Sequence, residues 1–210
     1  MFFFPILVLV IVFVVWFQWN LRKHSKTYGN GIKEFLENEK AFNFIKKKSI
    51  DPDLFFVPEI EKLPIKDYPD TEEFSRIISK QKKVIDKAAL TMIRLNKNMK
   101  NNDIKQKFGT ANLEIITLYE ENFNTYVRAL NDWAEALNKR NEYADAENAL
   151  KNAIDIGSEY SKTYILLADI YKAQSDESAL GLLLDKIKNE SAIKDNDVAL
   201  KKVIEYINIR

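Results

Sequence analysis

An uninterrupted apolar run at the beginning of the chain limits the possible folds more than any other part of the sequence. Residues 1–17, MFFFPILVLVIVFVVWF, contain no charged or polar side chain. As a helix, the segment 1–19 would reach about 28 Å, close to the ~30 Å hydrocarbon core of a bilayer. Trp16 and Trp19 would then lie at the end of the helix, where indole rings favour the lipid headgroup layer. We therefore predict that residues 1–19 form a transmembrane anchor.

The residues around this run indicate that it is retained and how it is oriented. A secretory signal peptide has positive residues before its apolar stretch and small residues at a cleavage site after it, and this sequence has neither. An uncleaved anchor is therefore favoured over a signal peptide and over a buried core helix. Arg22, Lys23 and Lys26 follow the run, and positive residues stay in the cytoplasm. We expect a single-pass protein of the cell membrane with its N-terminus outside, its C-terminal domain in the cytoplasm, and these three side chains against the lipid headgroups.

Positive charge is concentrated next to the apolar run. Residues 18–50 hold eight Lys or Arg against three Glu, a net charge of +5, so the other residues carry −4 within the total of +1. A basic segment of this kind gains about 1 kcal/mol per Lys or Arg near an anionic leaflet. For Lys46, Lys47 and Lys48 two interpretations stay open, contact with lipid or an ordinary solvated surface.

Two segments connect the anchor to the rest of the chain. Residues 20–50 are a basic juxtamembrane segment, in which the apolar spacing over 32–45 predicts a short helix. Residues 51–70 contain four prolines, which prevent a helix, yet the segment is too apolar for a free linker. We expect an extended strap that lies on a helical domain formed by residues 71–210. A partly ordered linker is the alternative.

Apolar residues at spacings of three and four predict two long helices in the next part of the chain. The first is expected over about 71–97, with Asp70 and Glu73 as a capping box at its start. An asparagine-rich loop follows, and the second helix is expected over about 110–139. The apolar stripe of this second helix consists of Ile116, Tyr119, Phe123, Tyr126, Leu130, Trp133 and Leu137. Two helices with such stripes are expected to pack antiparallel.

The sequence also repeats itself at an offset of 34 residues. Six apolar or small residues, Leu130, Trp133, Ala134, Leu137, Ala146 and Ala149, have apolar or small counterparts in Tyr164, Leu167, Ala168, Tyr171, Leu180 and Leu183. The pattern resembles the tetratricopeptide repeat (TPR), with repeats at about 127–156 and 161–190, although the second inter-helix turn, AQSDES, looks one residue short. The resemblance implies a helical-hairpin (TPR-like) α-solenoid domain. Together with the apolar run, it predicts an all-α protein in which an N-terminal transmembrane helix precedes that domain. The whole layout resembles single-pass proteins of clostridia-type bacteria.

Side chains suited to catalysis or cofactor binding are scarce in the helical part. The chain has no cysteine, and its only histidine is His24, beside the anchor. The five glycines form no phosphate-binding loop, and the carboxylates are spread at helical surface spacing. The helical part is net acidic, which argues against nucleic acid as a partner. The sequence therefore predicts no enzyme, no cofactor, no metal site and no small-molecule substrate.

Recognition of a protein partner is the function that remains. In the TPR family the first helices of the repeats line a concave groove, and the matching positions here are Arg128, Asn131, Glu135, Asn138, Lys162, Ile165, Asp169 and Lys172. Glu135 departs from the basic pattern with which some relatives bind a C-terminal carboxylate, so a mixed-charge peptide or helix is expected instead. Ordinary solvated side chains are the alternative for each position.

These observations predict a membrane-anchored, cytoplasm-facing scaffold that recruits a protein partner through a TPR-like groove. Tethering to a membrane raises the local concentration, so a weak groove affinity suffices. The alternative is a structural or assembly subunit of a larger membrane complex. Against it, the anchor lacks the spaced small residues and the polar residues that pack transmembrane helices together.

Overall fold

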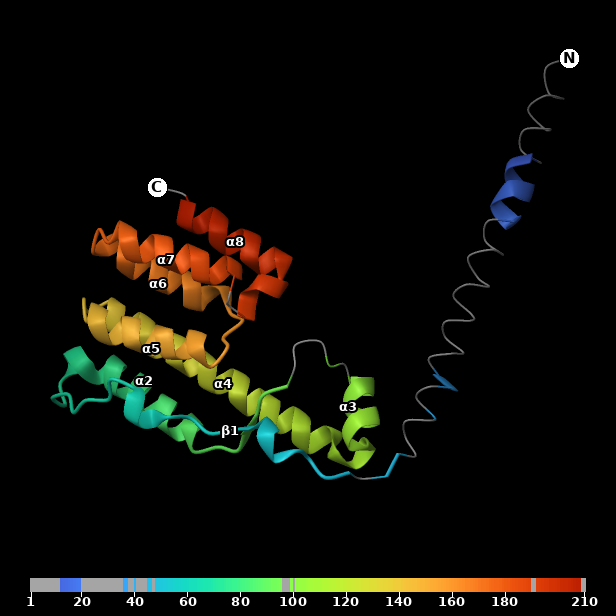
Figure 1. Ribbon diagram of the computed structural model, residues 1–210, viewed down its shortest axis with the longest axis horizontal. Helices are drawn as coiled ribbons and strands as arrows, with labels where there is room; N and C mark the ends of the chain where they lie inside the picture. Colours follow the sequence, from blue (N-terminus) through green and yellow to red (C-terminus); the bar gives the residue numbers. More distant parts are fainter. Residues whose placement is uncertain are drawn as a thin grey trace, which may run out of the picture. The chain divides into compact units, whose positions relative to one another are not determined.

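A computed structural model describes residues 12–19, 36–37, 40, 45–46, 48–95, 99, 101–189 and 192–208. Over these residues the protein is mostly helical, as the sequence predicts (Figure 1). The chain divides into two compact units, residues 1–50 with 96–115 and residues 51–95 with 116–210. The expected helix over 32–45 lies mostly outside the described residues, and the headgroup contacts predicted for Arg22, Lys23 and Lys26 lie wholly outside them.

In the first unit, residues 12–19 are helical, and the ring of Phe13 stacks on that of Phe17 with 5.9 Å between their centroids. Most of the predicted anchor lies outside the described residues. Within the described ranges, no helix has both the length and the apolar character needed to cross a membrane.

A short helix lies where the sequence predicts only an asparagine-rich loop. α3 (Asn101–Phe108) buries Ile104 and Phe108, which stand four residues apart and therefore share one helix face. The 3-10 turn η3 (Thr110–Asn112) follows, and the Asn112 amide donates to the main-chain oxygens of Lys48 (2.6 Å) and Phe108 (2.8 Å). The prediction of a plain loop was wrong, because two spaced apolar residues with a surface to pack on outweigh the weak helix propensity of asparagine.

The strap, residues 51–70, forms no α-helix and lies against the helices of the second unit. Its elements are η1 (Pro52–Leu54), β1 (Phe55–Phe56) and η2 (Ile60–Lys62). Leu63 is buried in the hydrophobic core, and Ile60, Ile65 and Tyr68 pack against that core. The extended path follows from the prolines, and its apolar side chains hold it to the helices.

The first long helix is shorter than its apolar pattern suggests. α2 (Glu72–Ala88) has Thr71 as its N-cap, and after Ala88 the chain turns into the strand β2 (Met92–Ile93). β2 pairs antiparallel with β1 and both of its residues are buried. The predicted continuation to residue 97 and the predicted N-cap at Asp70 were therefore wrong. Met92 and Ile93 form a strand and not a helix because they pair with β1 of the strap. The apolar pattern of one segment cannot show that its partner lies elsewhere in the chain.

α2 and the next long helix, α4 (Leu113–Asn138), pack antiparallel as predicted (Figure 1). Ion pairs join the two in reverse order along the chain: Glu73 with Arg140 just beyond α4, Arg76 with Glu135 (3.9 Å), and Lys80 with Asp132 (3.3 Å). The predicted apolar stripe of α4 is buried, apart from Tyr119, which is half-buried. The long-range packing in this part of the second unit thus follows from the periodicity of α4.

Two helical hairpins follow in chain order (Figure 1). The first consists of α4 and α5 (Tyr143–Asp155), the second of α6 (Ser161–Ala173) and α7 (Glu177–Asn189), and after them come η4 (Ala192–Asp195) and α8 (Asp197–Asn208). α6 packs against α5, α7 and α8. One hydrophobic core includes residues of all these α-helices, of α2 and of the strap.

Residues that stand 34 positions apart in the repeat also occupy equivalent places in the two hairpins. Leu130, Trp133, Ala134 and Leu137 are buried on α4, and their counterparts Tyr164, Leu167, Ala168 and Tyr171 are buried on α6. The turns correspond as well, since Asn141 and Ser175 have φ angles of 61° and 56°. The residue after each of them, Glu142 or Asp176, donates its N–H to the carbonyl five positions earlier, at 3.1 Å and 2.9 Å. The left-handed residue and this hydrogen bond are shared, but the second turn, residues 174–176, is one residue shorter than the first, residues 139–142, as expected from AQSDES.

This shared turn predicts a stabilising substitution. Ser175→Gly is expected to raise the free energy of unfolding by about 1 kcal/mol, because residues other than glycine are strained at positive φ. Asn141→Gly should give a smaller gain, since asparagine tolerates this region better. Ser178→Gly, the same chemical change inside α7, should instead lower stability by about 0.5 kcal/mol. Denaturation of the full chain in detergent, followed by circular dichroism, measures all three, and a loss of stability in Ser175→Gly would contradict the left-handed turn.

Candidate protein-binding site

The predicted groove residues lie on α4 and α6, the first helices of the two hairpins. Seven of the eight are exposed or half-buried: Arg128, Glu135, Asn138, Lys162, Ile165, Asp169 and Lys172. We call this surface the α4–α6 face. Asn131 does not belong to it, because it is only 2% exposed and its amide donates to the main-chain oxygen of Val127, 3.1 Å away on the same helix. The prediction for Asn131 was wrong because α4 is buried over most of its circumference in this part, where Val127, Leu130 and Ala134 are buried as well.

Two carboxylates on α4 join three helices at this face. Asp132 accepts hydrogen bonds from Lys80 of α2 (3.3 Å) and Lys162 of α6 (3.1 Å). Glu135 accepts one from Lys139, just after α4 (2.6 Å), and also pairs with Lys162 (2.8 Å). Ion pairs at a protein surface are each worth only about 0–1 kcal/mol. The charged groups of a partner can therefore replace them with little loss of stability.

These contacts shift the pKa of Glu135 and predict a pH dependence. Hydrogen bonds from Lys139 and Lys162 lower the pKa of Glu135 from its ordinary value of 4.5 to about 2. A carboxyl group with a lowered pKa stabilises the folded state above its ordinary pKa, and this contribution is lost as the pH falls through the folded-state value. Glu135→Gln should therefore lower the free energy of unfolding at pH 7, by about 1 kcal/mol after solvent screening. The difference from wild type should shrink as the pH falls from about 4.5 towards about 2.

Denaturation curves recorded between pH 7 and pH 2 test this expectation. Glu205→Gln is the matched control, because Glu205 is an exposed glutamate on α8. A destabilisation by Glu135→Gln that is the same at every pH would show that the lost contribution is packing and not charge.

The C-terminal part of the α4–α6 face is joined to α8. The Tyr206 hydroxyl donates to Asp169 (2.8 Å), and the Lys172 ammonium donates to the main-chain oxygen of Tyr206 (3.2 Å). Towards the start of the face, the Arg128 guanidinium lies 5.3 Å from the centre of the Tyr160 ring. The fold thus gathers the predicted residues on two neighbouring helices, but several of them already contact an adjacent helix.

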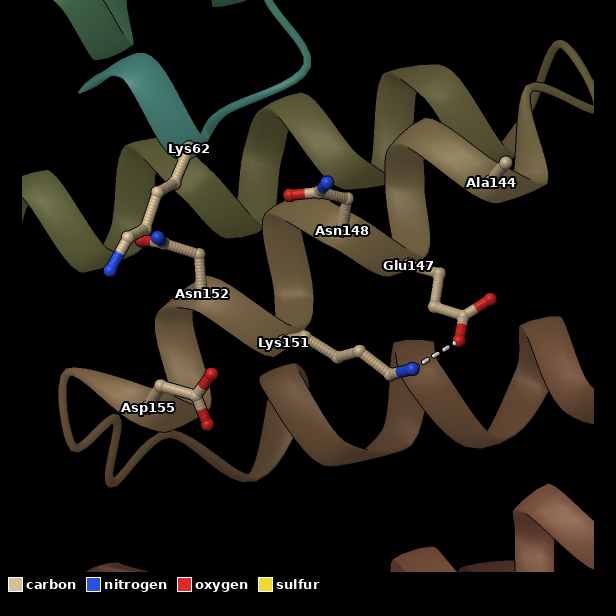
Figure 2. Close-up of a pocket in the computed structure, with 7 residues that line it drawn as sticks. All are labelled: Lys62, Ala144, Glu147, Asn148, Lys151, Asn152 and Asp155. Atoms are coloured by element: carbon tan, nitrogen blue, oxygen red, sulfur yellow. Dashed lines mark ion pairs between the residues drawn. The ribbon is translucent and has the colours of Figure 1, made fainter. Parts of the chain in front are cut away.

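A second candidate surface lies on α5, at residues that the sequence analysis did not single out. A hollow of about 370 Å³ is lined by Lys62 of the strap and by Ala144, Glu147, Asn148, Lys151, Asn152 and Asp155 of α5 (Figure 2). The opposite side of α5, with Ala146, Ala149, Leu150 and Ala153, is buried in the core. The helix pattern therefore turns the six polar or small residues outward.

Figure 2 shows how the side chains of this hollow are arranged. Asn148 and Asn152 stand one turn apart on α5, and Lys62 reaches over from the strap beside Asn152. Glu147 and Lys151 form an ion pair (2.7 Å) on the side of α5 that is nearer to α6. The family resemblance predicts binding residues only on the first helix of each repeat. On α5, the second helix, the only signal in the sequence was two asparagines four residues apart.

The described part of the chain contains no group of three or more His, Cys, Asp or Glu side chains placed to hold a metal ion. Comparison of the chain with protein-family models, with curated proteins and with solved structures found no match. The likeness to tetratricopeptide repeats therefore rests on the repeat inside this chain.

Proposed function

We propose that the protein is a membrane-anchored, cytoplasm-facing scaffold that recruits a partner protein through a TPR-like α-solenoid. The observation that carries the proposal is the internal repeat: at an offset of 34 residues, the first helices of two consecutive hairpins share four buried positions, and the hairpins share a left-handed turn residue. Stacked hairpins of this kind create extended surfaces for binding other proteins. The apolar length of residues 1–19 supports the membrane anchor.

The α4–α6 face is the proposed recruiting surface. Its central groups, Asp132, Glu135 and Lys162, carry both signs of charge and are partly exposed. Because the ion pairs among these groups are weak, charged groups of a partner can replace them and form new ion pairs with the same side chains. Two proteins at one membrane meet at a raised effective concentration, so modest affinity is enough for recruitment.

Crosslinking in intact cells, followed by mass spectrometry of the captured proteins, tests this proposal. We expect a reproducible partner for the wild type and for Lys188→Glu, a charge reversal at an exposed position of α7. Arg128→Glu, the corresponding reversal on the α4–α6 face, should reduce the capture. A wild type that captures no protein, or a capture that Arg128→Glu leaves unchanged, would contradict recruitment through this face.

The same cells separate a scaffold from a structural subunit of a membrane complex. In a scaffold, residues 1–19 act only as a tether, so an unrelated apolar span of equal length should preserve the capture. In a subunit whose transmembrane helix packs against other helices, the exchange should abolish it.

A further inference from the structure

We infer that the exposed side of α5 binds the main chain of an extended segment of a partner protein. The surface consists of Ala144, Asn148, Asn152 and Asp155, which follow one another along α5, and we call it the α5 ridge. The inference rests on the proposed function, in that the bound molecule is a protein. It adds a second surface, separate from the α4–α6 face, and names the groups that are recognised.

The two asparagine side chains of the α5 ridge are available for binding. Asn148 is exposed and Asn152 is half-buried, and among the described residues neither side chain makes a hydrogen bond. An asparagine amide offers an N–H donor and a C=O acceptor on the same planar group. A peptide main chain offers the complementary acceptor and donor, so one asparagine can bond to both groups of one residue.

The spacing of the two asparagines matches an extended chain. Residues four apart on an α-helix are separated by about 6 Å along its axis. Alternate residues of an extended strand are about 6.6–6.8 Å apart. Asn148 and Asn152 can therefore contact alternate residues of the same segment. The α5 ridge from 144 to 155 extends about 16 Å, which corresponds to about five extended residues.

The charges around the α5 ridge favour an uncharged ligand. Each charged side chain of the hollow has an opposite charge beside it, in the pairs Glu147 with Lys151 (2.7 Å), Asp155 with Lys186 (2.9 Å) and Lys62 with Glu59. A strongly acidic or basic ligand would have to break these pairs to use the charges. The amide groups of a main chain require no such exchange, because the asparagines meet them directly.

Lys62 gives the hollow a wall that comes from a different part of the chain. Its side chain comes down from the strap and ends beside Asn152, so the hollow lies between the strap on one side and the Glu147–Lys151 pair on the other (Figure 2). A chain lying along the α5 ridge is then confined on both sides. An extended segment suits this arrangement, because its main-chain groups are free to bond to the asparagines, whereas those of a helix are bonded to one another.

The test uses the full-length protein in lipid nanodiscs and a phage-displayed library of random linear peptides. Peptides selected on the wild type should bind the double variant Asn148→Ala/Asn152→Ala about tenfold more weakly or worse. Alanine is the best helix former, so this variant should stay folded. Asn208→Ala, the same change at an exposed position of α8, is the matched control and should bind like the wild type.

Peptide chemistry then tests whether the main chain is recognised. N-methylation removes a main-chain donor and leaves the side chain unchanged. Methylation at alternate positions of a selected peptide should therefore weaken binding, while alanine at the same positions should be tolerated. Equal binding by the wild type and the double variant, or failure to select any peptide, would overturn the inference. Either result leaves the proposed function standing if cellular capture still depends on Arg128, whereas loss of that capture with peptide binding intact would refute the proposed function alone.

Discussion

Deletion of residues 1–19 is expected to move the protein from the membrane fraction of the cell to the soluble fraction. These residues are apolar up to Gln18, and each Leu, Ile, Phe or Val at the centre of an inserted helix contributes about −0.3 to −0.6 kcal/mol to insertion. Summed over the run, this makes insertion effectively irreversible for the intact protein. Cell fractionation with an alkaline wash, followed by immunoblotting, measures the change.

Two further measurements fix the interpretation of this deletion. An unrelated apolar span of the same length in place of residues 1–19 should restore the membrane fraction. A protease added outside intact cells should leave the body uncut, because the proposed orientation places it in the cytoplasm. A purified mature chain that begins beyond Trp19, or a body digested from outside, would disprove the anchor or its orientation.

Trp133→Ala should lower the free energy of unfolding by about 3–5 kcal/mol, which is the usual cost of deleting a large core side chain. Trp133 is among the largest fully buried side chains of the described residues and has no exposed surface. It belongs to the apolar stripe of α4, and its counterpart in the second hairpin, Leu167, is buried as well. The cavity would therefore open at the first helix of the repeat, so loss of partner capture is also expected.

Trp133→Phe is the control for this substitution. The indole N–H of Trp133 has no acceptor among the described residues, so phenylalanine removes an unsatisfied donor and keeps most of the apolar volume. The expected loss is about 1 kcal/mol or less. Unfolding followed by circular dichroism compares the two variants with the wild type. If alanine and phenylalanine destabilise equally, volume is not what Trp133 contributes.

Local periodicity was sufficient to predict the helices that pack through their own stripes. The stripe of α4 and the 34-residue offset gave the antiparallel packing of α2 with α4 and the positions buried in both hairpins. Each of these features depends on residues a few positions apart or on a repetition that is visible in the sequence. The first long helix, in contrast, ends at Ala88 and not near residue 97 as its apolar pattern predicted, because Met92 and Ile93 pair with the strap.

The candidate site was predictable only in part, for a related reason. The resemblance placed Arg128, Glu135 and Lys162 on one face, and in the structure Glu135 and Lys162 form an ion pair. Whether a residue on that face is open depends on the elements packed around it, and Asn131 is buried. The α5 ridge was missed because one of the seven residues that line its hollow, Lys62, comes from the strap, and nothing local in the sequence connects Lys62 with α5.

The contact between the strap and α5 joins two segments that are synthesised at different times. Lys66 of the strap pairs with Asp145 of α5, 79 residues further along the chain. At about 5–20 residues per second, a ribosome makes those residues in about 4–16 s. During this interval the strap has been synthesised, but the α5 residue that pairs with Lys66 has not. The contact between the strap and α5 therefore forms late, whereas the partners of the strap in β2 and α2 are available earlier.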